Sequence, residues 1–235
     1  MKLGIIVAME EELKVVLNDM EVKDKSEHAG MVFYDGIYHD LEVIAVVCGV
    51  GKVNAAVCTQ ILISVYGADK IVNIGVAGGV RKDIKQGDVV IADTLIQHDV
   101  DAKGFGYDLG RIPRLDVFDF KSDRELIDIC LEAGKEGIKD HQIFVGRIVT
   151  GDQFIASAEK TEWLDRYFGA FACEMEGASI AQVCHLNKVP FIVIRSISDN
   201  ADSEAAVSFD EFLETAVENA TVILEGLVKE LKKAE

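Results

Sequence analysis

The chain has 235 residues, 49% hydrophobic and 28% charged, which is the balance of a packed globular protein rather than a disordered or fibrous one. Its formal charge of −17 argues against nucleic acid and membrane partners, because phosphate backbones and anionic lipids attract clustered Lys and Arg. The length suits one sizeable core, and no repeat or linker divides it. We therefore expect a single domain over residues 1–235.

Short β-branched runs alternate with helical stretches along the chain. The runs predict strands at residues 3–8, 41–48, 70–74, 88–92, 144–149 and 191–197. Helices are predicted at residues 53–66, 124–136 and 175–187. A last amphipathic helix is expected from Phe209 to Leu231, with Ser208 and Glu211 forming a capping box at its start. The alternation predicts an α/β sheet covered by helices.

Residues 99–119 break this alternation, because they are rich in Gly and aromatic residues and show neither a helical nor a strand period. A long loop in a compact domain is usually functional or interfacial. Its apolar residues, in so acidic a chain, favour a role in covering a site or a partner. The alternative is a loop folded against its own subunit.

Two glycine clusters follow predicted strands. The first, Gly49-Val50-Gly51-Lys52-Val53-Asn54, matches neither a dinucleotide-binding nor a P-loop pattern, and we interpret it as a tight strand-to-helix turn. The alternative is that its backbone N–H groups contact a ligand. The second, residues 75–79, contains only small residues. It either makes a turn or lets a flat ligand approach the backbone.

Carboxylates stand where three apolar segments end. Glu10-Glu11-Glu12 follows residues 3–8, Glu174-Met175-Glu176 follows residues 171–173, and Asp199 follows residues 191–197. Taken alone, each is explained as a solvated acid at a helix N-terminus. Ligands of open α/β sheets, however, bind outside the carboxyl ends of the strands, so we expect these groups to converge. Paired carboxylates with separated pKa values can serve as base and acid, which is what cleavage of an N-glycosidic bond needs.

Five cysteines, an odd number without a CxxC pair, indicate buried thiols in a reducing compartment, and we expect the cytoplasm. Three glutamates directly after a short apolar run argue against a secretory signal. No run reaches the roughly 20 apolar residues of a membrane span. The histidines are scattered without zinc spacing, so no metal site is predicted.

In the order and spacing of its motifs, nearly the whole chain resembles the methylthioadenosine/S-adenosylhomocysteine nucleosidases. The motifs are residues 4–12, residues 49–56, residues 98–107, Gly151-Asp152, Glu174-Met175-Glu176 and residues 195–199. The resemblance implies a single-domain three-layer α/β/α sandwich of the nucleoside phosphorylase/nucleosidase type, with a mixed, twisted central sheet, usually as a homodimer. It implies hydrolysis of adenine nucleosides, namely methylthioadenosine, adenosylhomocysteine and 5'-deoxyadenosine, without a cofactor.

The resemblance also implies roles for individual residues. Glu12 activates the attacking water, and Asp199 donates a hydrogen bond or a proton to purine N7. Glu176 binds the ribose hydroxyls. The other implied pocket residues are Met9, Val76, Ala77, Gly78, Phe154, Ile155, Glu174, Met175, Arg195 and Ser198, of which Phe154 and Ile155 hold adenine, Met175 packs on the sugar, and Glu174 and Arg195 organise the pocket. The implied lid over the partner subunit's pocket consists of Phe105, Tyr107 and Pro113.

One position departs from the family pattern. Val76 stands where better-known nucleosidases tend to have a serine, and valine cannot replace the hydroxyl hydrogen bond. A futalosine-type hydrolase is therefore one alternative. A purine or uridine phosphorylase is another, but phosphate binding favours several Arg, the first Arg is Arg81, and Glu12 would repel phosphate. A nucleoside-binding or storage protein of the same fold is the non-enzymatic alternative.

Overall fold

The computed structural model describes residues 1–202 and 205–234, and of residues 206–210 it describes the backbone alone. One mixed sheet holds all the described strands, which are β1 (Lys2–Val7), β2 (Met20–His28), β3 (Met31–Tyr38), β4 (Leu41–Val47), β5 (Lys70–Gly79), β6 (Val89–Gln97), β7 (Phe120–Lys121), β8 (Ile143–Thr150), β9 (Ala172–Glu174) and β10 (Phe191–Asp199). The helical segments are α1 (Glu10–Asn18), α2 (Lys52–Ser64), η1 (Lys103–Phe105), α3 (Arg124–Gly137), α4 (Ala158–Phe168), α5 (Gly177–Asn187) and α6 (Ala205–Lys233).

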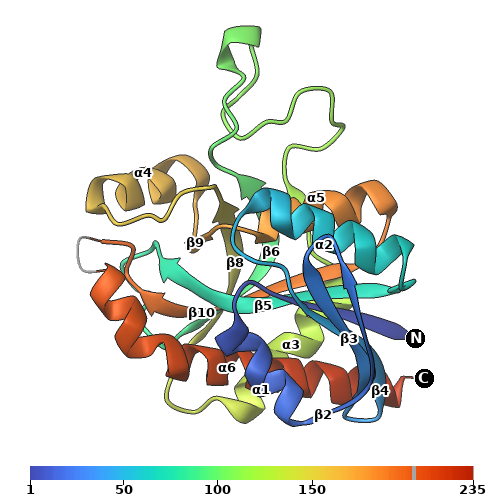
Figure 1. Ribbon diagram of the computed structural model, residues 1–235. Helices are drawn as coiled ribbons and strands as arrows, with labels where there is room; N and C mark the ends of the chain where they lie inside the picture. The colour runs from blue at the N-terminus through green and yellow to red at the C-terminus, as the bar shows by residue number, and fades with distance from the viewer. Residues whose placement is uncertain (203–204, 235) are drawn as a thin grey trace.

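The sheet lies between two helical layers, as predicted for a three-layer α/β/α sandwich (Figure 1). Its strand order is β10-β6-β8-β9-β5-β1-β4-β3-β2, with β7 paired to β6 and an additional pairing of β10 with β5. Strands β1, β5 and β10 run parallel to one another. Their carboxyl ends therefore meet at one edge, where Glu12 and Asp199 stand. Glu174 and Glu176 stand at the end of β9, which runs antiparallel to β5.

Both faces of the sheet are buried at its central strands β1, β5 and β10, which explains the continuous apolar runs in the sequence. Leu3, Ile5 and Val7 of β1 belong to a core shared with α3 and α6. Ile6, which points to the opposite face, packs in a second core with α2 and α5. Side chains that point to opposite faces of β1 thus pack against helices of opposite layers.

The structure corrects several predicted boundaries. Residues 75–79 do not form a turn after the strand, because they are part of β5, which continues through Gly79. The last predicted strand is also longer than expected, since β10 continues through Asp199. The hairpin of β2 and β3 was not predicted, because β2 is a charged edge strand with mostly exposed side chains. Helices α1 and α4 were not predicted either. Both are short, and each follows a strand end directly or by a brief loop.

The C-terminal helix α6 packs along α3, β10 and β5, as predicted for a helix on one face of the domain. It begins at Ala205, so its start lies before the predicted capping box. The structure does not describe the side chain of Ser208, so the predicted capping box lies outside the described residues. Within the described residues, no helix combines the length and hydropathy needed to cross a bilayer.

Candidate active site

A cavity of about 280 Å³ opens at the shared carboxyl ends of β1, β5 and β10. Every residue predicted to be catalytic or substrate-binding lines it, namely Met9, Glu12, Val76, Ala77, Gly78, Phe154, Ile155, Glu174, Met175, Glu176, Arg195, Ser198 and Asp199. These residues come from segments up to 190 positions apart in the chain (199 minus 9). The fold therefore brings together the complete predicted pocket of one subunit.

Glu12 lies in the first turn of α1, where the free backbone N–H groups of a helix start can hold a carboxylate. One of its oxygens, Oε2, accepts hydrogen bonds from the N–H groups of Ala8 and Met9, at 2.9 and 3.0 Å. The other, Oε1, accepts a longer one of 3.3 Å from Val76. Burial raises the pKa of Glu12, although Arg195 and these three N–H groups oppose the rise. A buried carboxyl with a raised pKa takes up a proton more readily than one in water.

Asp199 is the last residue of β10. Strand β10 lies on one side of β5, and β1, which leads to Glu12, lies on the other. Its Oδ2 accepts a hydrogen bond from the Ser198 hydroxyl at 2.8 Å, and its Oδ1 accepts one from the Ala201 N–H, also at 2.8 Å. Burial raises the pKa of Asp199 against these two hydrogen bonds. Two carboxyl groups with raised pKa values, Glu12 and Asp199, thus face one cavity from the two sides of β5.

The glycines of β5 make room for these carboxylates. A Cβ atom at Gly75 would lie 2.7 Å from Oε1 of Glu12, and one at Gly78 would lie 3.1 Å from Oδ1 of Asp199. Any side chain at Gly75 would collide with the Glu12 carboxylate. The small residues that the sequence offered as a ligand platform therefore also seat the protein's own acids.

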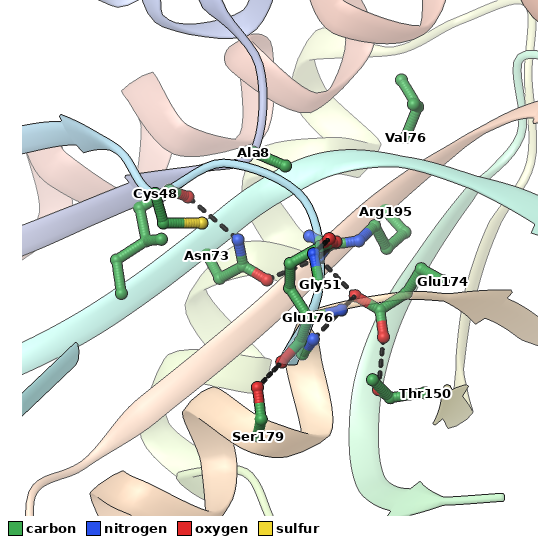
Figure 2. A network of polar contacts seen from close by, with 12 residues as sticks. Ala8, Cys48, Gly51, Asn73, Val76, Thr150, Glu174, Glu176, Ser179 and Arg195 are labelled. Carbon is green, nitrogen blue, oxygen red and sulfur yellow. Dashed lines mark hydrogen bonds and ion pairs between the residues drawn. The ribbon is translucent and has the colours of Figure 1, made fainter. Parts of the chain in front are cut away.

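Arg195 is the centre of a buried network that we call the arginine network, formed by Asn73, Glu174, Glu176 and Arg195 (Figure 2). Its Nη2 donates to Oε2 of Glu174 at 2.6 Å and to Oδ1 of Asn73 at 2.5 Å. Arg195 is only 1% exposed, so these partners replace the water that its charge has lost. Glu174 is further held by the hydroxyl of Thr150 and by the Gly177 N–H.

Glu176 is the N-cap residue of α5, and its side chain points toward Arg195. Its Oε1 accepts a hydrogen bond of 2.7 Å from the Gly51 N–H, and its Oε2 lies 4.0 Å from Nη2 of Arg195. Burial, and then the charge of Glu174, raise the pKa of Glu176 to about 7, against the opposing effects of Arg195 and Gly51. This group can therefore change its charge within the physiological pH range.

Several residues of the site were missed from the sequence. Asn73 is fully buried, and its polar side chain inside an otherwise apolar strand was a signal for an internal partner. The turn at Gly51 uses a backbone N–H, as one interpretation proposed, but its partner is the carboxylate of Glu176. The cavity also has lining residues that were not among the predicted site residues, namely Ala8, Val50, Ile74, Gly75, Gln153 and Cys173, although Val50 and Gly75 belong to the two glycine clusters considered as ligand contacts. Most are apolar or glycine, so their types carried no signal.

The predicted lid residues do not line the cavity of their own chain. Residues 99–119 project from the body of the molecule as the green loop of Figure 1, and Phe105 at its tip is 87% exposed. The two ends of this loop are fixed by ion pairs, Lys52 to Asp99 at 2.7 Å and Arg147 to Asp119 at 2.5 Å. The loop is therefore held at its base and exposed at its tip.

The cavity contains acids, a guanidinium and apolar walls. Among the described residues, no group of three or more His, Cys, Asp or Glu side chains is placed to hold a metal ion. The chemistry that these residues can perform by themselves is proton transfer and stabilisation of charge around a buried ligand.

The amino-acid sequence of the chain is similar to those of a known family of proteins along almost its whole length. The family model of the phosphorylase superfamily matches residues 2–229. A 5'-methylthioadenosine/S-adenosylhomocysteine nucleosidase of Exiguobacterium is 42% identical over 235 residues, covering 100% of both chains. The enzyme of the same name from Oceanobacillus iheyensis is 41% identical over 98% of this chain and 100% of its own.

Solved structures agree with these relatives. The nucleosidase of the same name from Neisseria meningitidis, in complex with methylthio-immucillin-A, superposes with a TM-score of 0.93 at 38% identity, over 97% of this chain and 99% of that one. The futalosine hydrolase of Helicobacter pylori superposes with a TM-score of 0.92 at 40% identity, over 97% of each chain. The predicted nucleoside phosphorylase/nucleosidase fold is thereby confirmed.

Proposed function

Because this chain belongs to the phosphorylase superfamily and, within it, to the methylthioadenosine/S-adenosylhomocysteine nucleosidases, we infer that it hydrolyses the N-glycosidic bond of these two nucleosides. Adenine and the 5'-thioribose are the products, and 5'-deoxyadenosine is a further expected substrate. The observation that carries this function is the convergence of Glu12, Glu176 and Asp199, each of them buried, on one cavity.

The reaction needs two opposite proton movements. When the bond between the sugar carbon and the purine nitrogen breaks, its electron pair goes to adenine, and Asp199 supplies a proton or hydrogen bond to N7. Water then forms the new bond to the sugar carbon and gives up a proton to Glu12. The raised pKa values of both groups support these roles, since burial makes each carboxyl hold a proton more readily than it would in water.

The remaining pocket residues bind the two halves of the substrate. Glu176 is suited to the ribose hydroxyls, because its carboxylate faces the cavity and is fixed by Gly51 and Arg195. Met175 would pack on the sugar. Phe154 and Ile155 would hold adenine, with Phe154 half exposed and Ile155 buried.

Water rather than phosphate is proposed as the nucleophile. Of the residues that line the cavity, Arg195 is the one guanidinium, and it is already bound to Glu174 and Asn73. A phosphate would also meet the buried Glu12 carboxylate. Adenine release from methylthioadenosine should therefore proceed equally with and without phosphate, and free thioribose should be the product. A sugar 1-phosphate as main product would overturn the hydrolase proposal.

The preference among substrates is set beside Val76. This side chain lines the cavity and its backbone N–H donates to Glu12, so the position offers the ligand an apolar surface and no hydroxyl. The same release assay, run with methylthioadenosine, adenosylhomocysteine, 5'-deoxyadenosine and futalosine, ranks the substrates. A dominant futalosine activity would assign the chain to that alternative.

We also propose a homodimer in which residues 99–119 cover the partner subunit's cavity. An exposed aromatic tip on a loop with fixed ends supports this, as does Val50, an apolar side chain that lines the cavity and is 52% exposed. Exposed apolar groups at the rim of a site often become buried in a partner. An apolar cover suits a thioether, which carries no charge.

The proposed compartment is the cytoplasm. The five cysteines are all free and buried, and none is paired in a disulfide. Such thiols are the ordinary state in a reducing environment. Fractionation of cells that express the protein, with a cytoplasmic marker enzyme as reference, tests this location.

A further inference from the structure

Ala201, two residues beyond Asp199, has an unusual backbone. Its φ of +52° is in the left-handed region, which costs a residue with a Cβ on the order of 1 kcal/mol or more. Its N–H nevertheless donates to Oδ1 of Asp199 at 2.8 Å, a bond that fixes the carboxylate from outside the cavity. The strained conformation must therefore be held by neighbouring structure.

The holding contacts come from α4. The carbonyl of Ala201 accepts a hydrogen bond of 2.7 Å from the Thr161 hydroxyl and one of 3.1 Å from the Ser157 N–H. Ser157 is the N-cap of α4, and Thr161 lies one turn further along it, 9% exposed. Both sides of the Ala201 residue are thus engaged, the N–H by Asp199 and the carbonyl by α4.

Close packing adds to this restraint. Ala201 is fully buried, and a Cβ atom built at Gly78 would lie only 2.8 Å from the Cβ of Ala201. The strand β5 and the helix α4 therefore enclose the turn from two directions. Helix α4 also follows Gln153, Phe154 and Ile155, which line the cavity, after only two residues. One element is then connected both to the proposed adenine wall and to Asp199.

We infer that Thr161 is a positioning residue for Asp199, acting through the carbonyl of Ala201. The inference rests on the proposed function, in which Asp199 serves the leaving purine. The Thr161 hydroxyl holds the left-handed turn, the turn aims the Ala201 N–H, and that N–H fixes Oδ1. The carboxyl then has one defined orientation toward the base, which matters because a positioned acid is worth far more than a mobile one.

The test replaces Thr161 by Val, which removes the hydroxyl and keeps the shape. We expect kcat for methylthioadenosine to fall about tenfold with KM little changed, because the defect lies in the orientation of Asp199 rather than in substrate binding. Thr161→Ser, which retains the hydroxyl, should keep kcat within about twofold of the unaltered protein.

Thr221 provides the matched control. Its hydroxyl is buried in α6 and donates to the carbonyl four residues earlier, at 2.8 Å. The Thr161 oxygen likewise lies 3.0 Å from the carbonyl oxygen four residues earlier, so its single hydrogen is shared between that carbonyl and the closer one of Ala201. Thr221→Val therefore loses the same kind of helical hydrogen bond without touching the Ala201 turn. We expect a similar loss of melting temperature in both valine variants and a loss of kcat in Thr161→Val alone.

Each outcome decides the inference. Equal kcat in the two valine variants, or a Thr161→Ser variant as slow as Thr161→Val, would overturn it while leaving the proposed function intact. Absence of adenine release from the unaltered protein would instead remove the proposed function. If Thr161→Val does not fold, Thr161→Ala, a better helix former, is compared with Thr161→Ser and isolates the hydroxyl in the same way.

Discussion

The arginine network and the loop of residues 99–119 border the same candidate site in opposite ways. The network is buried, and its guanidinium finds its partners within one chain. The loop is held by ion pairs at its two ends and by the buried Leu109, and it exposes the Phe105 ring. We call the arginine network together with Glu12 and Asp199 the floor of the site, and the loop of residues 99–119 its cover. The floor is complete in a single chain, whereas the cover is proposed to need a second one. Variants in the two regions should accordingly fail in different kinetic parameters.

The largest effect is expected on the chemical floor. Asp199→Asn and Glu12→Gln should each lower kcat by roughly two orders of magnitude or more, the scale of losing a positioned acid or base, while folding stays nearly intact. Steady-state adenine release and thermal melting measure the two quantities. Asp128→Asn, which alters an exposed ion pair on α3, is the control and should keep full activity. Near-normal kcat in both site variants would refute the catalytic assignment.

A smaller effect is expected on the cover. Replacing Phe105 and Tyr107 by Ala should raise KM for methylthioadenosine about tenfold, since the methylthio group loses apolar burial worth ~1.5 kcal/mol. The KM for adenosine, whose 5' end is polar, should change less, and kcat should change little for either substrate. Phe118→Ala, at the fixed end of the same loop, serves as control.

Two results would contradict the shared cover. The first is an equal rise of KM for both nucleosides, which would show that the loop does not select the 5' group. The second is full activity in a protein that analytical ultracentrifugation shows to be monomeric. Either result would return the loop to the simpler interpretation, in which it serves only its own subunit.

The smallest effect is a pH dependence that belongs to the floor. Burial and Glu174 raise the pKa of Glu176 to about 7. Its carboxylate accepts hydrogen bonds from ribose hydroxyls more strongly when ionised, because protonation turns one of its two oxygens into a donor, so kcat/KM should fall as the pH falls through this value. From about pH 8 to about pH 6.5 the decline should be roughly fourfold, and Glu176→Gln should remove this limb at a lower overall rate. A flat profile of the unaltered protein would exclude Glu176 as the titrating group.

The sequence was sufficient for the floor where residue type and strand position coincide. Glu12, Glu176 and Asp199 were expected together because each follows an apolar segment and parallel strands end at one edge. That reason holds for Glu12 and Asp199, whereas Glu176 follows β9, which runs antiparallel to β5 and reaches the same cavity from the opposite direction. The family resemblance then added the neighbours whose types are unremarkable, such as Ala77 and Ile155. All of these residues line one cavity.

Other features depend on neighbours far away in the chain. Asn73 acquires its partner only because β5 lies beside β10, with Asn73 opposite Val193 and Gly75 opposite Arg195. The strained turn at Ala201 depends on α4, a helix that the sequence did not reveal. Such contacts are set by tertiary packing, so no local pattern predicts them. The proposed pairing of two subunits is one step further removed.

The position of β5, between β1 from the start of the chain and β10 from near its end, has a consequence for how the protein matures. Glu12 and Asp199 are 187 residues apart in sequence (199 minus 12) and meet only across this strand. Pairings of such long range form late and slowly, because the intervening chain must be ordered first. During synthesis, no emerging fragment that ends before β10 can hold both carboxylates. Enzyme activity is therefore a direct reporter of completed folding, and a truncated or stalled product would be silent.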